Sequence, residues 1–363
     1  MPTLKRLAVV SLCFISPLST ATGLNFWESS TTNSALASAN GASAVDASIL
    51  ATAPSSMTQL ERTTITGNIT RYQVDTDYHI LGFETDYSKA DPIPAGFMVT
   101  PINDRWFFGM AAYSRTAADI SIPELTILFP ETRVRPIVVS FAPSVAYKIG
   151  DFSVALTAEY LYSDYLLEQN QCGILGNCRL EETTGNVDGW SGALSATWQI
   201  NDTVSIAGTH RLSSQFSDEN IEFDLPSITS AYATVKLMSG LNWHNSYSLS
   251  RWSGKRIAYT EYSDVIGLLK GSRHSKRYAT SLEYQWHSFT FMSGFSLDQA
   301  IDAFGGDDKR YRLGVGYAVN HNVRLDMTAF KENYARKYIE SPIGNVDVQN
   351  SGYGVGIGLT YQF

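Results

Sequence analysis

The chemistry that this sequence offers most plainly is the binding of an anion by arginine. Arg310 and Arg312 alternate with apolar residues in RYRLGV, and Arg211 and Arg277 stand in similar alternating stretches. A guanidinium group holds a carboxylate through paired N–H donors. If the surrounding elements turn these four side chains toward one interior, they form a candidate site for the carboxylate of a ligand.

Nucleophilic catalysis is the rival chemistry. It needs a serine or histidine supported by a base and by a residue that orients the base. The chain has six histidines, and His210 is the one that we weighed for this role, although the sequence assigns it no partner. We therefore predict no catalytic residues, no cofactor and no metal site.

Two cysteines remain once the N-terminal leader is set aside. Cys172 and Cys178 lie in QCGILGNCR, and no histidine is near them. An even number of cysteines in an exported chain favours a disulfide that closes a small loop, with a metal pair as the less favoured alternative.

The elements that must position these residues are β-strands. In the terminal stretch SGYGVGIGLTYQF, every odd position from Tyr353 to Phe363 is apolar and every even position is small or polar. Strict alternation is the period of a strand with one apolar face. Similar patterns predict fourteen strands, at residues 63–75, 94–102, 106–115, 136–148, 151–164, 188–200, 203–215, 225–237, 241–252, 275–286, 288–297, 309–319, 322–332 and 351–363.

The connections between these strands alternate in length. Short turns such as 103–105 and 320–322 alternate with long loops at 76–93, 116–135, 165–187, 253–274, 298–308 and 333–350. Outer-membrane barrels place short turns in the periplasm and long loops outside, whereas a soluble β-sandwich has no reason to sort its loops. We therefore predict an all-β fold, a 14-stranded antiparallel transmembrane β-barrel.

The start of the chain predicts export. MPTLKRLAVVSLCFISPLSTA has a basic start, a short apolar run and small residues at a cleavage site, as secretory signal peptides do. We place the signal peptide at residues 1–21, an N-terminal hatch (plug) at 22–62 and the barrel at 63–363. The formal charge of −8, which becomes about −10 when Lys5 and Arg6 are removed, argues against a nucleic-acid partner.

The hatch segment has two possible homes, a tail in the periplasm or a plug inside the barrel lumen. It carries Phe26, Trp27 and Met57 among several apolar residues, which is too many for a solvated tail. We therefore favour a plug. The glycines on the inward face of the last strand are consistent with a wall that a plug approaches closely.

At this point the sequence resembles a known family. TGLNFWESS, NGASAVDASILATAPSSMTQL and PAGFMVTPINDRWFFGMAAYSR are similar to stretches of the FadL-type long-chain fatty acid transporters of the Gram-negative outer membrane, and the resemblance covers the whole mature chain. It implies a monomeric barrel with a hatch that includes Ala53, Pro54 and Ser55, where the family has Asn-Pro-Ala. It also implies a lateral gap where the third strand kinks, at Gly109, Arg115 and Thr116.

Strand parity sets the expected polarity of the lumen. It turns the four arginines inward against a single acid, Glu159, so the upper lumen is expected to be net basic. With the resemblance, this favours uptake of long-chain fatty acids through the lumen and the gap. An aromatic-hydrocarbon transporter of the same family, and a structural barrel or adhesin without transport, are the alternatives.

The remaining expected partners belong to the membrane. The outer wall is expected to contact outer-membrane lipid and lipopolysaccharide. Tyr361 and the terminal Phe363 resemble the C-terminal signal that the barrel-assembly machinery recognises in outer-membrane proteins. We therefore predict a multi-pass barrel in the outer membrane of a Gram-negative bacterium.

Overall fold

The computed structural model describes residues 26–80, 83–117, 120–122, 131–172, 178–219, 221–259, 269–270, 273–302, 304–341 and 344–363. The predicted signal peptide and the first residues of the predicted hatch lie outside these ranges. In the described ranges, no helix is long and apolar enough to cross a membrane.

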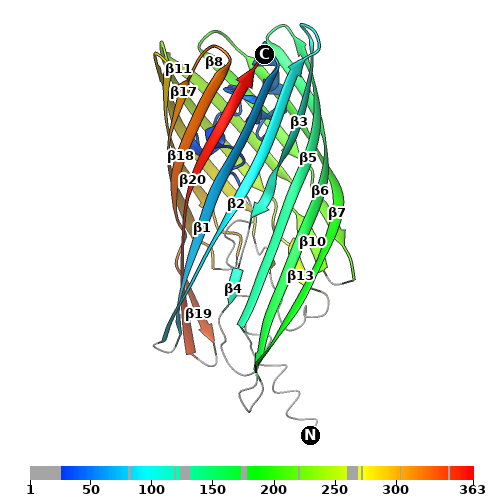
Figure 1. Ribbon diagram of the computed structural model, residues 1–363, viewed down its shortest axis with the longest axis vertical. Coiled ribbons are helices and arrows are strands. Elements are labelled where there is room, and N and C mark those ends of the chain that lie inside the picture. Colours follow the sequence, from blue (N-terminus) through cyan, green and yellow to red (C-terminus); the bar gives the residue numbers. More distant parts are fainter. Residues whose placement is uncertain are drawn as a thin grey trace.

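Fourteen antiparallel strands close into a barrel, which confirms the predicted fold class (Figure 1). Around the wall they are β1 (Thr64–Ile80), β2 (Phe83–Pro101), β3 (Trp106–Ala117), β5 (Glu131–Ile149), β6 (Phe152–Cys172), β7 (Cys178–Gln199), β8 (Val204–Arg211), β11 (Ile228–Met238), β12 (Leu241–Ser250), β15 (Ser275–Trp286), β16 (Phe289–Gln299), β17 (Asp307–Ala318), β18 (Val323–Asn333) and β20 (Gly344–Gln362). β20 closes the barrel on β1, with Thr64 opposite Gln362 at one end and Ile80 opposite Val346 at the other.

The two faces of the wall follow the alternation in the sequence. Outward side chains such as Leu156, Trp190 and Leu313 expose 67–68% of their surface. The inward face carries glycine, serine, threonine and the charged residues. An apolar outer band around a closed barrel is stable in a bilayer, because every strand edge is paired and lipid covers the band.

Several predicted loops are strands, and this part of the prediction is wrong. β1 and β2 stay paired to Ile80 opposite Phe83, and β6 and β7 stay paired to Cys172 opposite Cys178. The predicted ends followed apolar alternation, which stops where the wall leaves the lipid. Backbone pairing needs no apolar face, so the polar stretches continue as hairpins. At the same end, β19 (Lys337–Ser341) pairs with the outer part of β20.

A second, small sheet lies inside the barrel, against the inner face of the wall. It comprises β9 (Ser214–Ser217), β10 (Ile221–Leu225), β13 (Arg256–Tyr259) and β14 (Leu269–Lys270), while β4 (Ile120–Ile122) pairs with β5. The predicted strand 203–215 therefore ends at Arg211. Phe216 stacks on Phe223 at 5.0 Å and packs against the inner face of β7 at Gly189. The small sheet fills part of the lumen there.

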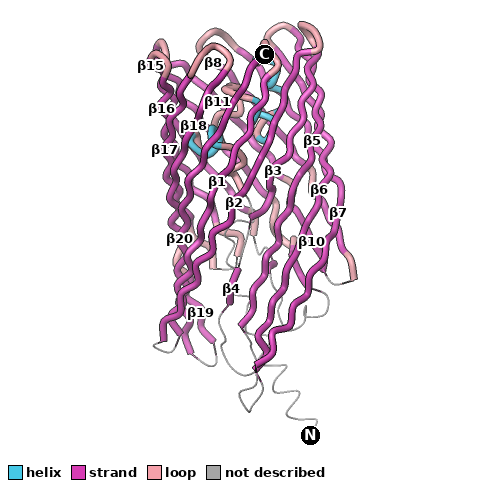
Figure 2. Tube along the Cα trace, in the orientation of Figure 1, coloured by secondary structure: helices cyan, strands magenta, loops and turns pink. Residues whose placement is uncertain are grey.

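The N-terminal segment, residues 26–62, lies inside the barrel (Figure 2). It contains α2 (Thr31–Ala35) and two 3₁₀ helices, η1 (Ala47–Ala51) and η2 (Pro54–Gln59). The Ser30 hydroxyl accepts from the Asn33 N–H and caps α2, and the Asp46 side chain caps η1. Nearly every residue from Phe26 to Thr58 is buried.

Candidate functional site

Hydroxyl groups tie η2 to the barrel wall. The Ser55 N–H donates to Ser195 Oγ at 2.8 Å, and the Ser55 hydroxyl lies 2.6 Å from Thr197 Oγ1. The Thr58 hydroxyl lies 2.7 Å from Ser153 Oγ. These contacts attach η2 to β6 and β7.

The residues around this motif support the same short helix. Ala53 is the N-cap of η2, offers no side-chain cap, and packs with Ala42, Ala207 and Tyr232. Pro54 takes the first helical position, where its missing N–H costs nothing and its fixed φ angle favours the helix.

The periplasmic half of the lumen holds an apolar core between the N-terminal segment and the wall. Leu50 and Met57 from the segment cluster with Phe97, Val99 and Phe107 from β2 and β3, and each of these five residues is at most 5% exposed. Burial of this size holds the segment against the wall by the hydrophobic effect.

Glycines let the segment come close to the wall. A Cβ atom added to Gly109 on β3 would lie 2.5 Å from Leu50 Cδ2, and one added to Gly314 on β17 would lie 2.4 Å from the Ala35 Cβ. A larger residue at either position must therefore displace the segment. The inward glycines serve close packing, as their positions in the sequence suggested.

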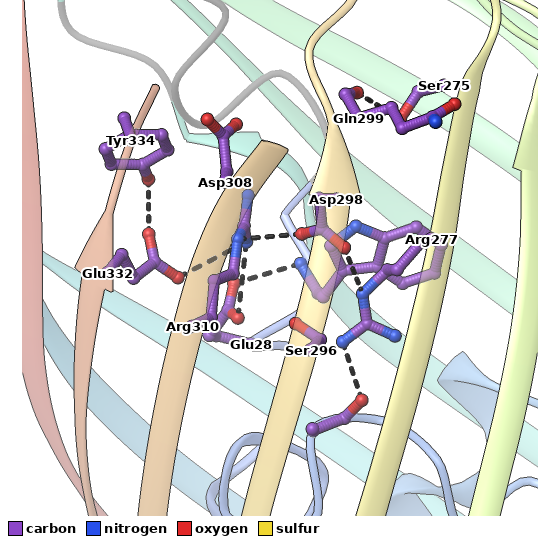
Figure 3. A network of polar contacts seen from close by, with 12 residues as sticks. Glu28, Ser275, Arg277, Ser296, Asp298, Gln299, Asp308, Arg310, Glu332 and Tyr334 are labelled. Carbon is purple, nitrogen blue, oxygen red and sulfur yellow. Dashed lines mark hydrogen bonds and ion pairs between the residues drawn. The ribbon is translucent and has the colours of Figure 1, made fainter. Parts of the chain in front are cut away.

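Three of the candidate arginines, Arg277, Arg310 and Arg312, lie in a buried ion-pair network. Figure 3 shows Arg277 and Arg310 with their acidic partners. Arg310 contacts Asp298 at 2.8 Å, Glu332 at 3.2 Å and Glu28 at 3.6 Å. Arg312 also contacts Glu28, and lies 3.4 Å from Glu332. Burial alone would raise the pKa of Glu28, but the guanidinium groups of Arg312 and Arg310 hold that pKa below its usual range. Glu28 is thus an ionised carboxylate that joins the N-terminal segment to β17.

Arg277 completes this network on β15. It lies 2.9 Å from Asp298, donates to the Ala37 carbonyl oxygen at 2.6 Å, and stacks over the Trp27 ring at 4.6 Å. Cation–π contacts of this kind add to the charge pairing. Trp27 and Ala37 both belong to the N-terminal segment, so Arg277 binds the segment directly.

The fourth arginine lies in a separate network on the other side of the lumen. Glu159, which is fully buried, contacts Arg115 at 2.6 Å and Arg211 at 3.1 Å and accepts from the Tyr113 hydroxyl at 3.2 Å. Arg211 also donates to the Ala51 carbonyl oxygen at 3.3 Å. This network links β3, β6 and β8 to the N-terminal segment.

The expectation that four arginines face the single acid Glu159 is wrong. Glu28, Asp298 and Glu332 supply carboxylates that the expected set lacked. Extending the alternation of β16 and β18 to Asp298 and Glu332 would have predicted that both side chains point into the lumen. Glu28 lies in a segment that is not a strand, so alternation predicts nothing for it. The structure pairs all four candidate arginines with acids of the protein, and their contact with a ligand carboxylate stays a prediction.

The barrel wall has an open seam between β2 and β3. These two strands pair only from Pro101 opposite Phe107 to Gly96 opposite Ala112. In the described residues beyond that point, β2 pairs with β1 alone as far as Phe83. Figure 1 shows β3 ending midway while β2 and β5 diverge on either side of it.

A cavity of about 380 Å³ lies at this seam. Its lining is mostly apolar and comprises Tyr72, Val74, Asp91, Pro92, Ile93, Pro94, Ala95, Gly96, Ala112, Ser114, Ile137, Val139 and Phe141. Tyr72 and Ile93 are buried on the lumen side, whereas Phe141 is 48% exposed on the outer face. The cavity therefore has walls on both faces of the barrel.

Phe26 packs against two residues that line this cavity, Tyr72 and Ile93. It also packs with Phe330, and its ring lies 5.9 Å from that of Tyr72. The Phe26 N–H donates to the Arg115 carbonyl oxygen at 3.2 Å. The start of the described N-terminal segment is thus attached both to the seam and, two residues later, to the arginine network.

The three residues predicted for the lateral gap lie near the seam but do not line its cavity. Gly109 faces the N-terminal segment instead. Arg115 occupies a β-bulge, where the register between β3 and β5 shifts. The Thr116 hydroxyl donates to the Pro136 carbonyl oxygen at 2.9 Å and accepts from the Val138 N–H. The bulge lies where β3 has left β2. The cavity at the seam is lined by residues of β1, β2, β3 and β5, and the longest continuous stretch comes from β2.

The other predicted positions are placed at the two ends of the barrel. Cys172 lies opposite Cys178 where β6 meets β7; their side chains lie outside the described residues, and the disulfide stays a prediction. Phe363 donates its N–H to the Thr63 carbonyl oxygen at 3.0 Å, and its exposed ring lies 4.8 Å from that of Tyr361. The role of this pair as an assembly signal also stays a prediction.

A closed fourteen-stranded barrel with an apolar outer band and a folded segment in its lumen defines an outer-membrane transport barrel. The chain belongs to the family described as outer membrane transport proteins (OMPP1/FadL/TodX), whose model matches residues 12–217. It is a transporter of hydrophobic compounds in the outer membrane of a Gram-negative bacterium, and the family is one of transport proteins.

Solved structures support the same fold. A FadL homologue from Pseudomonas aeruginosa is similar with a TM-score of 0.79 at 15% identity, and the match covers 94% of this chain and 100% of that one. The toluene transporter TodX from Pseudomonas putida is similar with a TM-score of 0.73 at 13% identity, over 94% of this chain and 100% of that one. A search of curated protein sequences found no significant match.

Proposed function

We propose that this protein takes hydrophobic molecules from outside the cell into its lumen and releases them sideways into the bilayer through the seam between β2 and β3. The cavity at this seam, which is lined by residues of both the lumen face and the outer face, is the observation that carries the proposal. A hydrophobic solute released there enters lipid without crossing the polar periplasmic face, and burying each methylene group favours that path by about 0.8 kcal/mol.

We propose neutral molecules, of the aromatic-hydrocarbon class, as the first substrate candidate. The cavity lining contains Asp91 but no arginine or lysine, so it offers a carboxylate no partner and a nearby negative charge. All four candidate arginines have acids beside them. The similarity to a toluene transporter supports this choice.

Long-chain fatty acids are the second candidate. Glu28 already presents a carboxylate to Arg312 and Arg310 from a segment that is not part of the wall. A fatty acid that displaced Glu28 would gain the same two guanidinium groups without leaving them unpaired. In this proposal the arginines bind a substrate carboxylate only by exchange.

Uptake of two substrates separates these candidates. Cells that express the protein are given radiolabelled toluene or oleate, and the same is done with the double variant Glu28→Gln/Arg312→Gln, which removes one charge of each sign. For neutral substrates we expect toluene uptake that depends on the protein and does not fall in the variant. For fatty acids by exchange, we expect oleate uptake to fall at least tenfold in the variant.

Protein-dependent uptake of neither compound, in cells where folded barrel is present in the outer membrane, would contradict both candidates. That result would favour the structural or adhesive barrel.

A further inference from the structure

One backbone edge of β2 faces β1 and the other faces the seam. The structure shows which residues direct their N–H and C=O groups to each edge. The Phe363 N–H donates to the Thr63 carbonyl oxygen, so odd residues at the start of β1 face β20 and even residues face β2. In the β1–β2 register every even residue of β1 lies opposite an odd residue of β2, for example Thr70 opposite Ile93, and every odd residue of β1 lies opposite an even residue of β2. In an antiparallel ladder, the backbone N–H and C=O groups of two directly opposite residues either point toward each other or both point away. The odd residues of β2 therefore face β1, and the even residues face β3 and the seam.

The first two even residues beyond the last β2–β3 pair are Pro94 and Pro92. Neither has an N–H to donate. The β1–β2 register runs through both of them without a shift, because their missing donors lie on the other edge. Both rings are exposed on the outer face, where Ile69 and Phe141 also lie.

A strand edge that borders hydrocarbon leaves its N–H groups without partners, and unsatisfied groups there are costly. Proline in sheets is favoured at edges, at the first residue of a strand and at bulges, where no ladder donor is needed. We infer that Pro92 and Pro94 keep the seam of this barrel open, because they remove the two N–H donors that would otherwise pair with β3 or remain unsatisfied in lipid. In the extended β2–β3 register, Pro94 stands opposite Ser114, where pairing would resume.

The effect of the prolines on β2–β3 pairing is independent of transport, whereas their effect on uptake rests on the proposed function. Valine at these positions restores the donors and keeps an apolar side chain toward lipid. In the variant Pro92→Val/Pro94→Val, we expect the backbone pairing between β2 and β3 to extend to these positions. Amide exchange of residues 112–117 should then slow by roughly fivefold or more for each new hydrogen bond. Hydrogen–deuterium exchange mass spectrometry in lipid vesicles measures this rate. Toluene uptake should fall in parallel.

Pro143→Val is the matched control. Pro143 lies on β5 with an outward ring, and because the Lys148 N–H reaches β3, its own nitrogen faces β6. This variant restores a donor away from the seam and should change neither measurement. The single variants Pro92→Val and Pro94→Val give intermediate effects and keep the test valid if the double variant does not fold, as judged by its heat shift in gel electrophoresis.

Unchanged exchange of residues 112–117 in the folded valine variants would overturn the inference. Slower exchange with unchanged uptake would support the inference and contradict the lateral route of the proposed function instead.

Discussion

Replacing Glu159 with leucine is expected to destabilise the barrel by about 3–5 kcal/mol, because breaking a buried ion pair leaves its partners charged and unpaired. Glu159 is the carboxylate that the structure places between Arg115 and Arg211, and the side chains of both arginines are at most 10% exposed. Urea unfolding in lipid vesicles, followed by tryptophan fluorescence, measures the change.

The same strand offers a matched control. Glu168 on β6 contacts Arg133 at 3.1 Å, but the side chains of both are about one-quarter exposed, at 25% and 24%. An ion pair near solvent contributes about 0–1 kcal/mol, so Glu168→Leu should change stability little. Equal effects of the two substitutions would show that the Glu159 network does not hold β3, β6 and β8 together.

Glu28→Gln is expected to loosen the start of the N-terminal segment. The substitution keeps the shape of the side chain but removes the charge that Arg312 and Arg310 contact. Hydrogen bonds to charged groups contribute about 1.5–3 kcal/mol, so amide exchange in residues 26–36 should accelerate by roughly tenfold to a hundredfold. Because the pKa of Glu28 is lowered in the folded protein, its contribution is complete above the usual glutamate pKa of about 4.3 and is lost as the pH falls below it.

Glu61→Gln serves as the control for this prediction, since Glu61 is exposed at the other end of the same segment. Loosening the segment also frees Phe26 from Tyr72 and Ile93, which line the seam cavity, so toluene uptake in Glu28→Gln should rise. Exchange rates equal to those of the unmodified protein, measured at neutral pH, would show that Glu28 does not hold the segment.

The sequence was sufficient to predict the wall of the barrel. Each of the fourteen strands has a long apolar alternation that the lipid requires, and the end of β20 shows it most clearly. The outer hairpins were missed because the polar residues from Asp75 to His79 have no such requirement, while backbone pairing continues through them.

The site was predictable only in part. Parity turned Arg310 and Arg312 inward correctly, but their partner Glu28 comes from a segment whose path in the lumen is set by tertiary packing. The seam was assigned to β3 by resemblance. Its border on β2 was legible in the sequence as two prolines at alternate positions, in DPIPAG, a pattern that demotes a strand to an edge.

Reversible blocking of the seam cavity is the most direct test of release through the seam. Ser114 lines the cavity, so Ser114→Cys places a thiol there. Cys172→Ser and Cys178→Ser remove the other cysteines of the mature chain. A bulky methanethiosulfonate reagent then labels the new thiol, and toluene uptake is measured before labelling, after labelling and after reduction. The same label at Leu313→Cys, a lipid-facing position on β17, is the control. If solutes leave through the seam, uptake is lost on labelling at Ser114→Cys alone and returns on reduction; unchanged uptake by fully labelled protein would contradict release through the seam.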